Sequence, residues 1–271
     1  MSAIVAFSDV HLGYELADSD AFIDFVKVLQ SRDDLGDVVI VGDFVDLWRR
    51  DVIGLEFELS GFVEELKTLQ RKGVKVHYVA GNHDAHVEYL KNHAYPFEAQ
   101  PLVTIERFGY TIRFLHGHQC DPLQNILGPN TSDILCWTLS DNIGKQKDWL
   151  WEILTSKGFQ RDKLEAKIDS LTQPPEDKHR IEAFEEKFGG VADFVECLKA
   201  HFKLTGENEF IVYGHTHKPF IDIGKRVANT GCWIKGANPA NTYFEFGSWP
   251  PYLVEFKGQP LKSTSISMLK F

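Results

Sequence analysis

Side chains of the kinds that bind metal ions are gathered in five short blocks of the sequence. These blocks are Ser8-Asp9-Val10-His11, Gly42-Asp43-Phe44-Val45-Asp46, Gly81-Asn82-His83-Asp84, His116-Gly117-His118 and Gly214-His215-Thr216-His217. Imidazole, carboxylate and amide oxygen suit borderline divalent ions such as Mn, Fe, Co, Ni and Zn. The blocks contain no thiolate, which argues against a structural zinc site. Their residue types therefore predict a centre for divalent cations.

The spacing inside the blocks suggests how the side chains could face one site. In an extended segment, side chains two residues apart lie on the same side. This alternation would aim Asp9 with His11, and His215 with His217, at a common point. Glycine stands beside these groups at Gly42, Gly81, Gly117 and Gly214. Glycine lets the backbone turn sharply and approach a ligand closely.

Each block follows an apolar run that is typical of a buried strand. The first half of the chain alternates such runs, at residues 3–7, 38–41 and 74–80, with segments of helical periodicity. One helix is expected to begin behind Ser19 as its cap, and the next to end at Gly73. This order predicts a βαβαβ unit with a parallel sheet.

Further strands are expected on either side of a long polar segment. They are predicted at residues 102–106, 111–115, 210–213, 220–223, 226–229, 242–246 and 252–256. We predict an α/β fold, a four-layer α/β/β/α sandwich in which helices cover two facing mixed sheets. The core would comprise residues 1–120 and 206–271, and residues 121–205 would form an inserted helical cap. One sheet would come from the parallel first half and the other from the last sixty residues.

This arrangement would bring the five blocks together. In open α/β sheets, ligands bind at the carboxyl ends of the strands, so the blocks are expected to share one crevice. Taken alone, a histidine is more often structural, and glycine before a polar residue is ordinary turn chemistry. The joint pattern favours a site, because chance would have to place every block at a strand end.

Composition limits the other classes of function. A chain of 271 residues with 43 % hydrophobic residues can bury a packed core. The net charge of -10 disfavours a broad grip on the nucleic-acid backbone, although acidic metal ligands would themselves contribute to it. The N-terminal region lacks the pattern of a signal peptide, and the apolar run at residues 4–7 is too short to span a bilayer. We expect a cytoplasmic protein.

The cysteines are few and widely spaced. They are Cys120, Cys136, Cys197 and Cys232, with no CxxC pair among them. This pattern argues against a thiolate metal site and against a dense disulfide framework. Reduced, structural thiols are the expectation.

In order and in content, the five blocks resemble the calcineurin-like metallophosphoesterase family, whose pattern is D-x-H, GDxxD, GNH[DE], a later His and GHxH. The resemblance spans the chain except for the insertion. It implies two divalent metal ions, with Mn expected and Fe, Zn, Co or Ni as alternatives. One ion would be bound by Asp9, His11 and His217, the other by Asn82, His116 and His215, with Asp43 bridging the two.

The same resemblance implies catalytic residues that bind no metal. His83 would stabilise the transition state or protonate the leaving oxygen, with Asp84 fixing the tautomer of His83. Two cations about 3.5 to 4 Å apart would lower the pKa of a shared water and offset charge on the substrate. The implied reaction is hydrolysis of a phosphoester or pyrophosphate bond. The motifs leave five residues without an assigned role: Asp46, Arg49, Arg50, His118 and Asp121.

Three features resemble the branch of the family that contains UDP-2,3-diacylglucosamine pyrophosphohydrolase. They are the insertion, the GDFVDLW segment at residues 42–48 and the Asn-Thr-Gly-Cys-Trp run at residues 229–233. The implied partner is a phosphorylated small molecule or lipid-linked substrate, covered by apolar side chains around Trp137 and Trp149. Peripheral membrane contact through the cap would follow. That enzyme typically has Arg where this chain has His83.

Two other functions fit parts of the pattern. A DNA-repair-type nuclease shares the GNHD block at residues 81–84, but such proteins usually add their capping domain after the GHxH block. A scaffold protein on the same fold would be expected to have lost metal ligands, whereas this chain retains the complete set.

Overall fold

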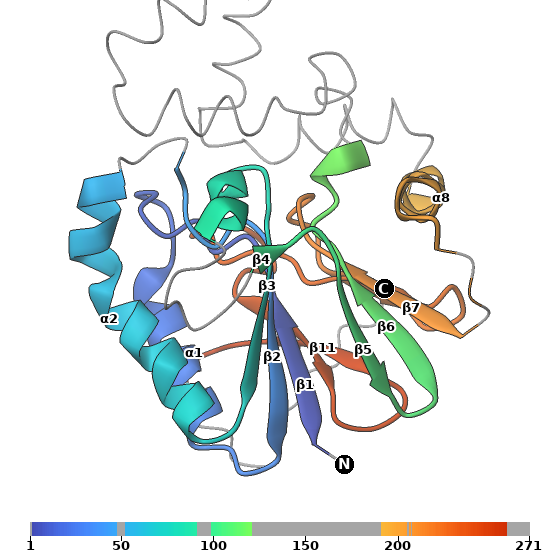
Figure 1. The fold of residues 1–271 in the computed structure, drawn as a ribbon, viewed down its shortest axis with the longest axis horizontal. Helices are drawn as coiled ribbons and strands as arrows, with labels where there is room; N and C mark the ends of the chain where they lie inside the picture. The colour runs from blue at the N-terminus through green and yellow to red at the C-terminus, as the bar shows by residue number, and fades with distance from the viewer. Residues whose placement is uncertain are drawn as a thin grey trace, which may run out of the picture.

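The molecule is arranged in four layers, with helices outside two facing sheets (Figure 1). The computed structural model describes residues 2–47, 52–90, 99–120, 191–204, 206 and 208–258. Within these ranges, the predicted α/β/β/α sandwich is confirmed.

The first sheet contains the parallel strands that the sequence predicts. Its order over the described residues is β11-β10-β1-β2-β3-β4. The strands are β1 (Ala3–Phe7), β2 (Leu35–Val41), β3 (Lys75–Val79), β4 (Ala99–Gln100), β10 (Thr242–Phe246) and β11 (Tyr252–Glu255). β1 to β4 are parallel, while β10 pairs antiparallel with β1 and β11 antiparallel with β10.

The second sheet faces the first and has the described order β5-β6-β7-β9-β8. Its strands are β5 (Val103–Arg107), β6 (Tyr110–Phe114), β7 (Glu209–Tyr213), β8 (Phe220–Asp222) and β9 (Val227–Asn229). β6, β7 and β9 run parallel to one another. As a result, the carboxyl ends of β6 and β7 lie at one edge of this sheet.

The expected division of strands between the sheets was wrong in two places. The β5–β6 hairpin from the first half joins the second sheet, and β10 and β11 from the last sixty residues join the first. The reason is burial: every residue of β1 and of β10 is buried, so both strands need an interior position with partners on each side.

Helices cover the outer face of each sheet. α1 (Ser19–Gln30) and α2 (Val52–Arg71) lie on the first sheet, and α8 (Val191–Phe202) lies on the second (Figure 1). The periodic residues Phe22 and Phe25 of α1 are buried against β1. The cap expected at Ser19 was wrong, because the cap position is Asp18, whose side chain makes no capping hydrogen bond.

Most of the predicted cap lies outside the described residues, and so do Arg49, Arg50, Asp121, Trp137 and Trp149. The described part, residues 191–204, packs on the core: Phe194 and Leu198 of α8 belong to the same apolar cluster as Tyr213 of β7. No helix of the described residues has both the length and the apolar character that a membrane crossing requires.

A disulfide joins α8 to the loop after β6. Cys120, in the short 3-10 helix η2 (His118–Cys120), is bonded to Cys197, with their Cα atoms 6.1 Å apart. The expectation of reduced thiols was wrong for this pair, because α8 packs against η2 and brings together cysteines 77 positions apart. Cys232 is fully buried.

Candidate metal centre

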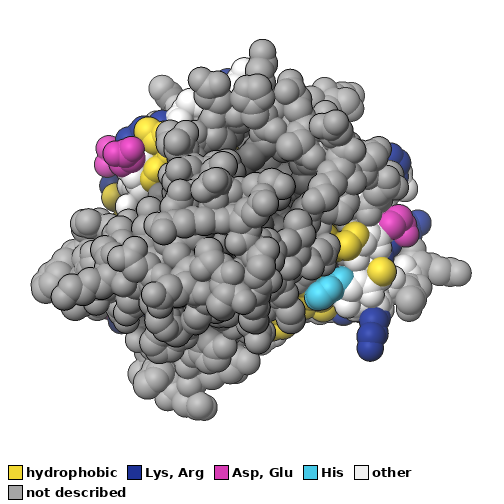
Figure 2. Space-filling model, turned by 90° about the horizontal axis from the view of Figure 1, so that it is seen from above, with side chains coloured by type: hydrophobic (Ala, Val, Ile, Leu, Met, Phe, Trp, Pro, Cys, Tyr) yellow, Lys and Arg dark blue, Asp and Glu magenta, His cyan; other side chains and the backbone are white. Residues whose placement is uncertain are grey.

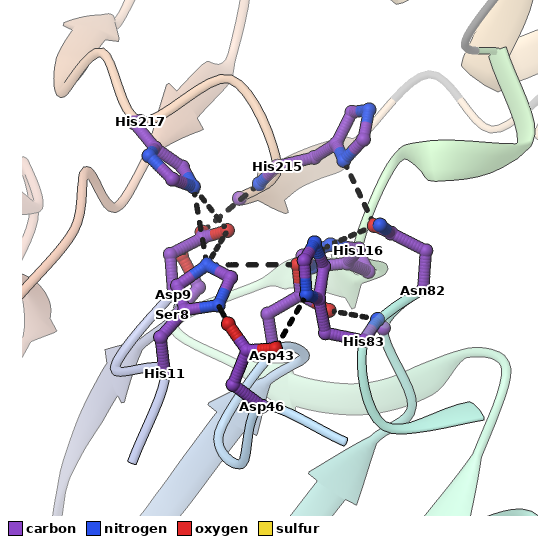
Figure 3. A network of polar contacts seen from close by, with 12 residues as sticks. Ser8, Asp9, His11, Asp43, Asp46, Asn82, His83, His116, His215 and His217 are labelled. Atoms are coloured by element: carbon purple, nitrogen blue, oxygen red, sulfur yellow. Dashed lines mark hydrogen bonds and ion pairs between the residues drawn. The ribbon is translucent and has the colours of Figure 1, made fainter. Parts of the chain in front are cut away.

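The five polar blocks lie together at one edge of the two sheets, in the loops that follow β1, β2, β3, β6 and β7 (Figures 1 and 3). Because these strands are parallel within each sheet, their carboxyl ends share that edge. The structure therefore brings the seven predicted metal ligands into one cluster.

The first group of ligands consists of Asp9, His11 and His217, whose ligand atoms all lie within 4.8 Å of one another. The Nε2 atoms of His11 and His217 are 3.3 Å apart. His217 Nε2 also lies 3.2 Å from Asp9 Oδ1. Three potential ligand atoms thus point toward one small volume.

The second group consists of Asn82, His116 and His215. Asn82 Oδ1 lies 3.2 Å from His116 Nε2 and 3.1 Å from His215 Nδ1. His116 Nδ1 donates a hydrogen bond of 2.8 Å to the Val41 carbonyl oxygen, which leaves Nε2 as the ring nitrogen directed at the group.

Asp43 lies between the two groups. Its Oδ2 atom is 3.8 Å from His11 Nε2 in the first group and 3.2 Å from His116 Nε2 in the second. Its Oδ1 atom accepts a hydrogen bond of 2.8 Å from the backbone N–H of His83. One oxygen is therefore held by the backbone and the other is directed between the groups, the position that a bridging carboxylate requires.

The ligands reach the centre through left-handed backbone conformations. The residues with positive φ are Asp9 (52°), His11 (51°), Asp43 (50°), His215 (65°) and His217 (59°). The expectation that D-x-H and H-x-H would be extended was therefore wrong. The left-handed conformation costs non-glycine residues roughly 1 to 2 kcal/mol each, and backbone strain of this kind clusters at functional sites.

Two glycines allow the loops to touch. A Cβ atom at Gly81 would lie 2.4 Å from the backbone nitrogen of Asp43, and one at Gly214 would lie 2.5 Å from Asp9 Oδ2. Neither carboxylate could keep its place beside a larger residue. These glycines are needed for close approach, as the sequence predicts.

Asp46 is the carboxylate that orients His83. Its Oδ1 atom lies 3.0 Å from His83 Nδ1, and its Oδ2 atom lies 3.1 Å from His11 Nδ1 (Figure 3). Asp46 is fully buried. One carboxylate thus holds both a predicted metal ligand and the predicted catalytic histidine. The second Asp of the GDxxD block was the available signal for this role, and sequence reasoning missed it.

Asp84 does not fix the tautomer of His83, contrary to expectation. Its carboxylate instead accepts hydrogen bonds from the backbone N–H of Phe44 (2.7 Å), the backbone N–H of Gly81 (2.6 Å) and the hydroxyl of Tyr78 (2.6 Å). Burial, with the nearby charge of Asp43, raises the pKa of Asp84 to about 6. Asp84 ties the loops after β2 and β3 together.

The centre concentrates negative charge. Although burial favours the neutral acids, the imidazoles of His116 and His83 hold the pKa of Asp43 well below its usual range. His217 similarly lowers the pKa of Asp9 against the effect of burial. Burial alone would lower the pKa of His116, but Asp43 and Asp9 outweigh it and raise that pKa to about 10. The carboxylates of Asp9 and Asp43 are therefore ionised, and their negative charge favours bound cations.

Divalent metal ions fit this donor set. Asp9 Oδ1 is buried and accepts no hydrogen bond. A buried, anionic oxygen that accepts no hydrogen bond is costly unless a cation compensates its charge. Imidazole nitrogens, carboxylates and one amide oxygen complete a set that suits borderline divalent ions.

Several further residues belong to the surroundings of the centre. The His118 ring lies 5.5 Å from the ring of His116 and 6.4 Å from that of His215. Asn229 donates a hydrogen bond of 2.7 Å to the Gly214 carbonyl oxygen and so braces the loop that carries His215. Trp233 is buried against Phe25 in the core. The run at residues 229–233 is thus a structural support of the site and the core.

Comparison with known proteins identifies a family. The sequence profile described as calcineurin-like phosphoesterase matches residues 2–219. No curated protein matches the chain.

Several solved structures are similar to the chain at low identity. Vacuolar Protein Sorting 29 from Cryptosporidium parvum is 13 % identical, with 95 % of this chain and 93 % of that chain covered and a TM-score of 0.44. A novel archaeal phosphodiesterase is 14 % identical, with coverages of 90 % and 92 % and a TM-score of 0.41. A Thermotoga maritima protein is 15 % identical, with coverages of 94 % and 99 % and a TM-score of 0.43. These scores carry no conclusion about activity.

Proposed function

Because this chain belongs to the calcineurin-like phosphoesterase family, which uses a dinuclear divalent metal centre, we propose that the cluster of Asp9, Asp43 and their neighbours is its active site. The chain is a metal-dependent phosphoester hydrolase. The observation that carries the proposal is the position of Asp43 Oδ2 between two groups of ligand atoms.

In this proposal the two groups have the same task at different ions. Asp9, His11 and His217 would hold the first ion, and Asn82, His116 and His215 would hold the second, with Asp43 between them. Two such ions would supply an activated water and offset negative charge on a phosphate. Manganese is the proposed metal.

His83 acts on the substrate rather than on a metal. Asp46 accepts a hydrogen bond from Nδ1 of His83, which assigns proton transfer with the substrate to Nε2. A histidine held in this way can protonate the leaving oxygen or stabilise charge on the phosphate. His83 is 4 % exposed, which leaves this small part of the residue open to solvent.

The substrate is proposed to be a phosphorylated small molecule or a lipid-linked nucleotide sugar cleaved at its pyrophosphate. The support is the resemblance to the UDP-2,3-diacylglucosamine pyrophosphohydrolase branch at residues 42–48 and 229–233. Nucleic acid is a weaker candidate. The net charge is -10, and among the described side chains visible in Figure 2, basic groups stand beside acidic and apolar ones without forming a continuous basic surface.

A hydrolysis screen with Mn²⁺ tests the proposal. It should contain aryl phosphate mono- and diesters, nucleotide sugars, UDP-linked diacylglucosamine and DNA, each assayed with wild type and Asp43→Asn. We expect metal-dependent hydrolysis of a nucleotide sugar that the variant lacks. Cleavage of DNA in preference to every small substrate would replace the substrate proposal with a nuclease. If protein loaded with two ions hydrolyses none of these substrates, the proposed function is contradicted.

The insertion is proposed to select the substrate. None of the proposed metal ligands lies in residues 121–205. Shortening this segment, with the two ends rejoined, should spare cleavage of a small aryl phosphate and reduce cleavage of a large substrate, because binding energy remote from the phosphorus is lost. Equal loss on both, with the core folded and metal-loaded, would assign the segment to catalysis.

A cytoplasmic location is also proposed. The Cys120–Cys197 disulfide counts against it, because disulfides are rare in reducing compartments. Thiol labelling of protein taken rapidly from cells tests the point. Labelling of both cysteines would support a cytoplasmic location, and protection of both would contradict it.

A further inference from the structure

The Asp9 carboxylate is held asymmetrically by its surroundings. Its Oδ2 atom accepts one hydrogen bond from the Ser8 hydroxyl and one of 2.9 Å from the backbone N–H of His215. Its Oδ1 atom accepts none, is buried, and lies 3.2 Å from His217 Nε2. One oxygen is therefore fully engaged by the protein, and the other is directed at the first group of ligands.

The Ser8 hydroxyl belongs to a buried relay that starts at Thr230. Ser8 Oγ and Thr230 Oγ1 are 2.5 Å apart, and both residues are fully buried. Each hydroxyl has a single hydrogen. An anionic carboxylate is the strongest acceptor within reach of Ser8, so the Ser8 hydrogen goes to Asp9 Oδ2. Thr230 must then donate to Ser8, since its other acceptor, the Tyr213 carbonyl oxygen, is 3.4 Å away.

The relay contacts only one of the two ligand groups through side chains. Among the described residues, the two hydroxyls bond to each other, to Asp9 and to the carbonyl oxygens of Tyr213 and Gly231. Neither hydroxyl bonds to Asn82 or His116. The Gly214 backbone packs so closely on Ser8 that a Cβ at Gly214 would lie 2.4 Å from Ser8 Oγ, which keeps the hydroxyl in place.

We propose that Ser8 and Thr230 are positioning residues for Asp9, which keep Oδ1 directed at the first metal site and act on the affinity of that site alone. The inference rests on the proposed dinuclear centre. Partners that orient a metal ligand typically change metal affinity by about 10- to 100-fold when they are removed. Neither residue carries a charge.

The test is Mn²⁺ affinity, measured by calorimetry in two backgrounds that each leave one site. Asn82→Ala cripples the second site, and His217→Ala cripples the first. In the Asn82→Ala background, Ser8→Ala should raise the Kd of the remaining ion by about 10- to 100-fold. In the His217→Ala background, the same substitution should change the Kd by no more than about twofold, as expected for independent groups.

Two further variants separate positioning from loss of a buried hydroxyl. Thr230→Val removes the donor to Ser8 and should weaken the first site by less than Ser8→Ala does. Thr242→Val is the matched control: Thr242 is fully buried, and its hydroxyl donates to the Thr230 backbone carbonyl oxygen at 2.6 Å, outside the chain of side chains from Thr230 through Ser8 to Asp9. It should leave both affinities unchanged. If Ser8→Ala does not fold, as judged by circular dichroism, Thr230→Val carries the test in both backgrounds.

The outcomes distinguish this inference from the proposed function. Equal weakening of both sites by Ser8→Ala, no weakening of either, or an equal effect of Thr242→Val would each overturn the positioning role while two ions still bind to wild type. Wild-type protein that binds fewer than two Mn²⁺ ions per chain would instead overturn the dinuclear centre, and this inference with it.

Discussion

The two ligand groups of the centre are held in different ways. In the first group, side chains hold two of the ligands: Asp46 accepts a hydrogen bond from His11 Nδ1, and Ser8 donates one to Asp9, which also accepts one from the backbone N–H of His215. In the second group, His116 Nδ1 is held by the backbone carbonyl of Val41, and the oxygen ligand is the neutral amide of Asn82.

The difference also concerns charge. The first group has its own carboxylate, Asp9, with a second one, Asp46, behind His11, whereas the second group shares only Asp43. Attraction between a cation and an oxygen ligand grows with the charge on the ligand. The comparison predicts that the centre binds one ion tightly and the other weakly, and that substitutions affect the two affinities separately.

The largest effect is expected from the residue that the two groups share. Asp43→Asn should impair both sites and abolish turnover, because a neutral amide cannot supply the bridging charge. Metal analysis and a hydrolysis assay on the same sample check this, and metal content and rate should fall together. Two retained ions with near-normal rate would show that Asp43 does not bridge.

Removal of His83 should leave both groups intact. His83→Ala is expected to lower kcat by about 100-fold or more, the range for a positioned acid or charge stabiliser. Metal content should stay at two ions per chain. If an ion were lost instead, the residue would have to be reassigned as a ligand.

Asp46 tests whether the first group depends on its side-chain support. The two carboxylate oxygens of Asp46 accept from His83 Nδ1 and His11 Nδ1, and an amide offers only one acceptor oxygen. Asp46→Asn should therefore weaken the first ion by about 10- to 100-fold and spare the second. Mn²⁺ calorimetry in the His217→Ala and Asn82→Ala backgrounds measures the affinity of each site separately. Equal weakening of both affinities would show that the two groups do not differ in their dependence on Asp46.

Graded removal of metal should expose the difference without any substitution. During dialysis against increasing concentrations of a chelator, the ion at Asn82, His116 and His215 should leave first, because its ligands carry less negative charge. Metal analysis at each step would show a plateau at one ion per chain, and Asn82→Asp should shift the first loss to higher chelator concentration. Loss of both ions in a single step would argue for equal sites.

The smallest effect on turnover is expected at Asp84. Its carboxylate accepts from three donors, so Asp84→Asn places an amide N–H₂ against them and should lower the free energy of unfolding by about 1 to 3 kcal/mol. The kcat of the folded variant should stay near that of wild type. Thermal unfolding and kinetics on the same preparation check both parts, and a loss of kcat as large as that of His83→Ala would restore a catalytic role.

The elements, and the gathering of the five polar blocks at one site, were largely predictable from the sequence because their signals are local. The apolar run at residues 3–7 and the periodic Phe22 and Phe25 depend on burial, which leaves a direct pattern in the chain. The ligand blocks were predictable because metal chemistry restricts residue type and because each block follows a strand.

The remaining features depend on three-dimensional packing. The exchange of strands between the sheets depends on which strands pair with the two sides of β1. The Cys120–Cys197 bond depends on the packing of α8 against the second sheet. The choice of Asp46 rather than Asp84 as the partner of His83 depends on the direction of a loop. These properties have no fixed spacing in the sequence.

The central claim is that Asp43 bridges two ions, and a crystal structure of Mn²⁺-loaded protein with anomalous difference maps tests it most directly. Two peaks about 3.5 to 4 Å apart are predicted, one beside Asp9, His11 and His217 and one beside Asn82, His116 and His215, with Asp43 Oδ2 between them. A single peak, or two peaks of which either lies away from Asp43, would contradict the claim.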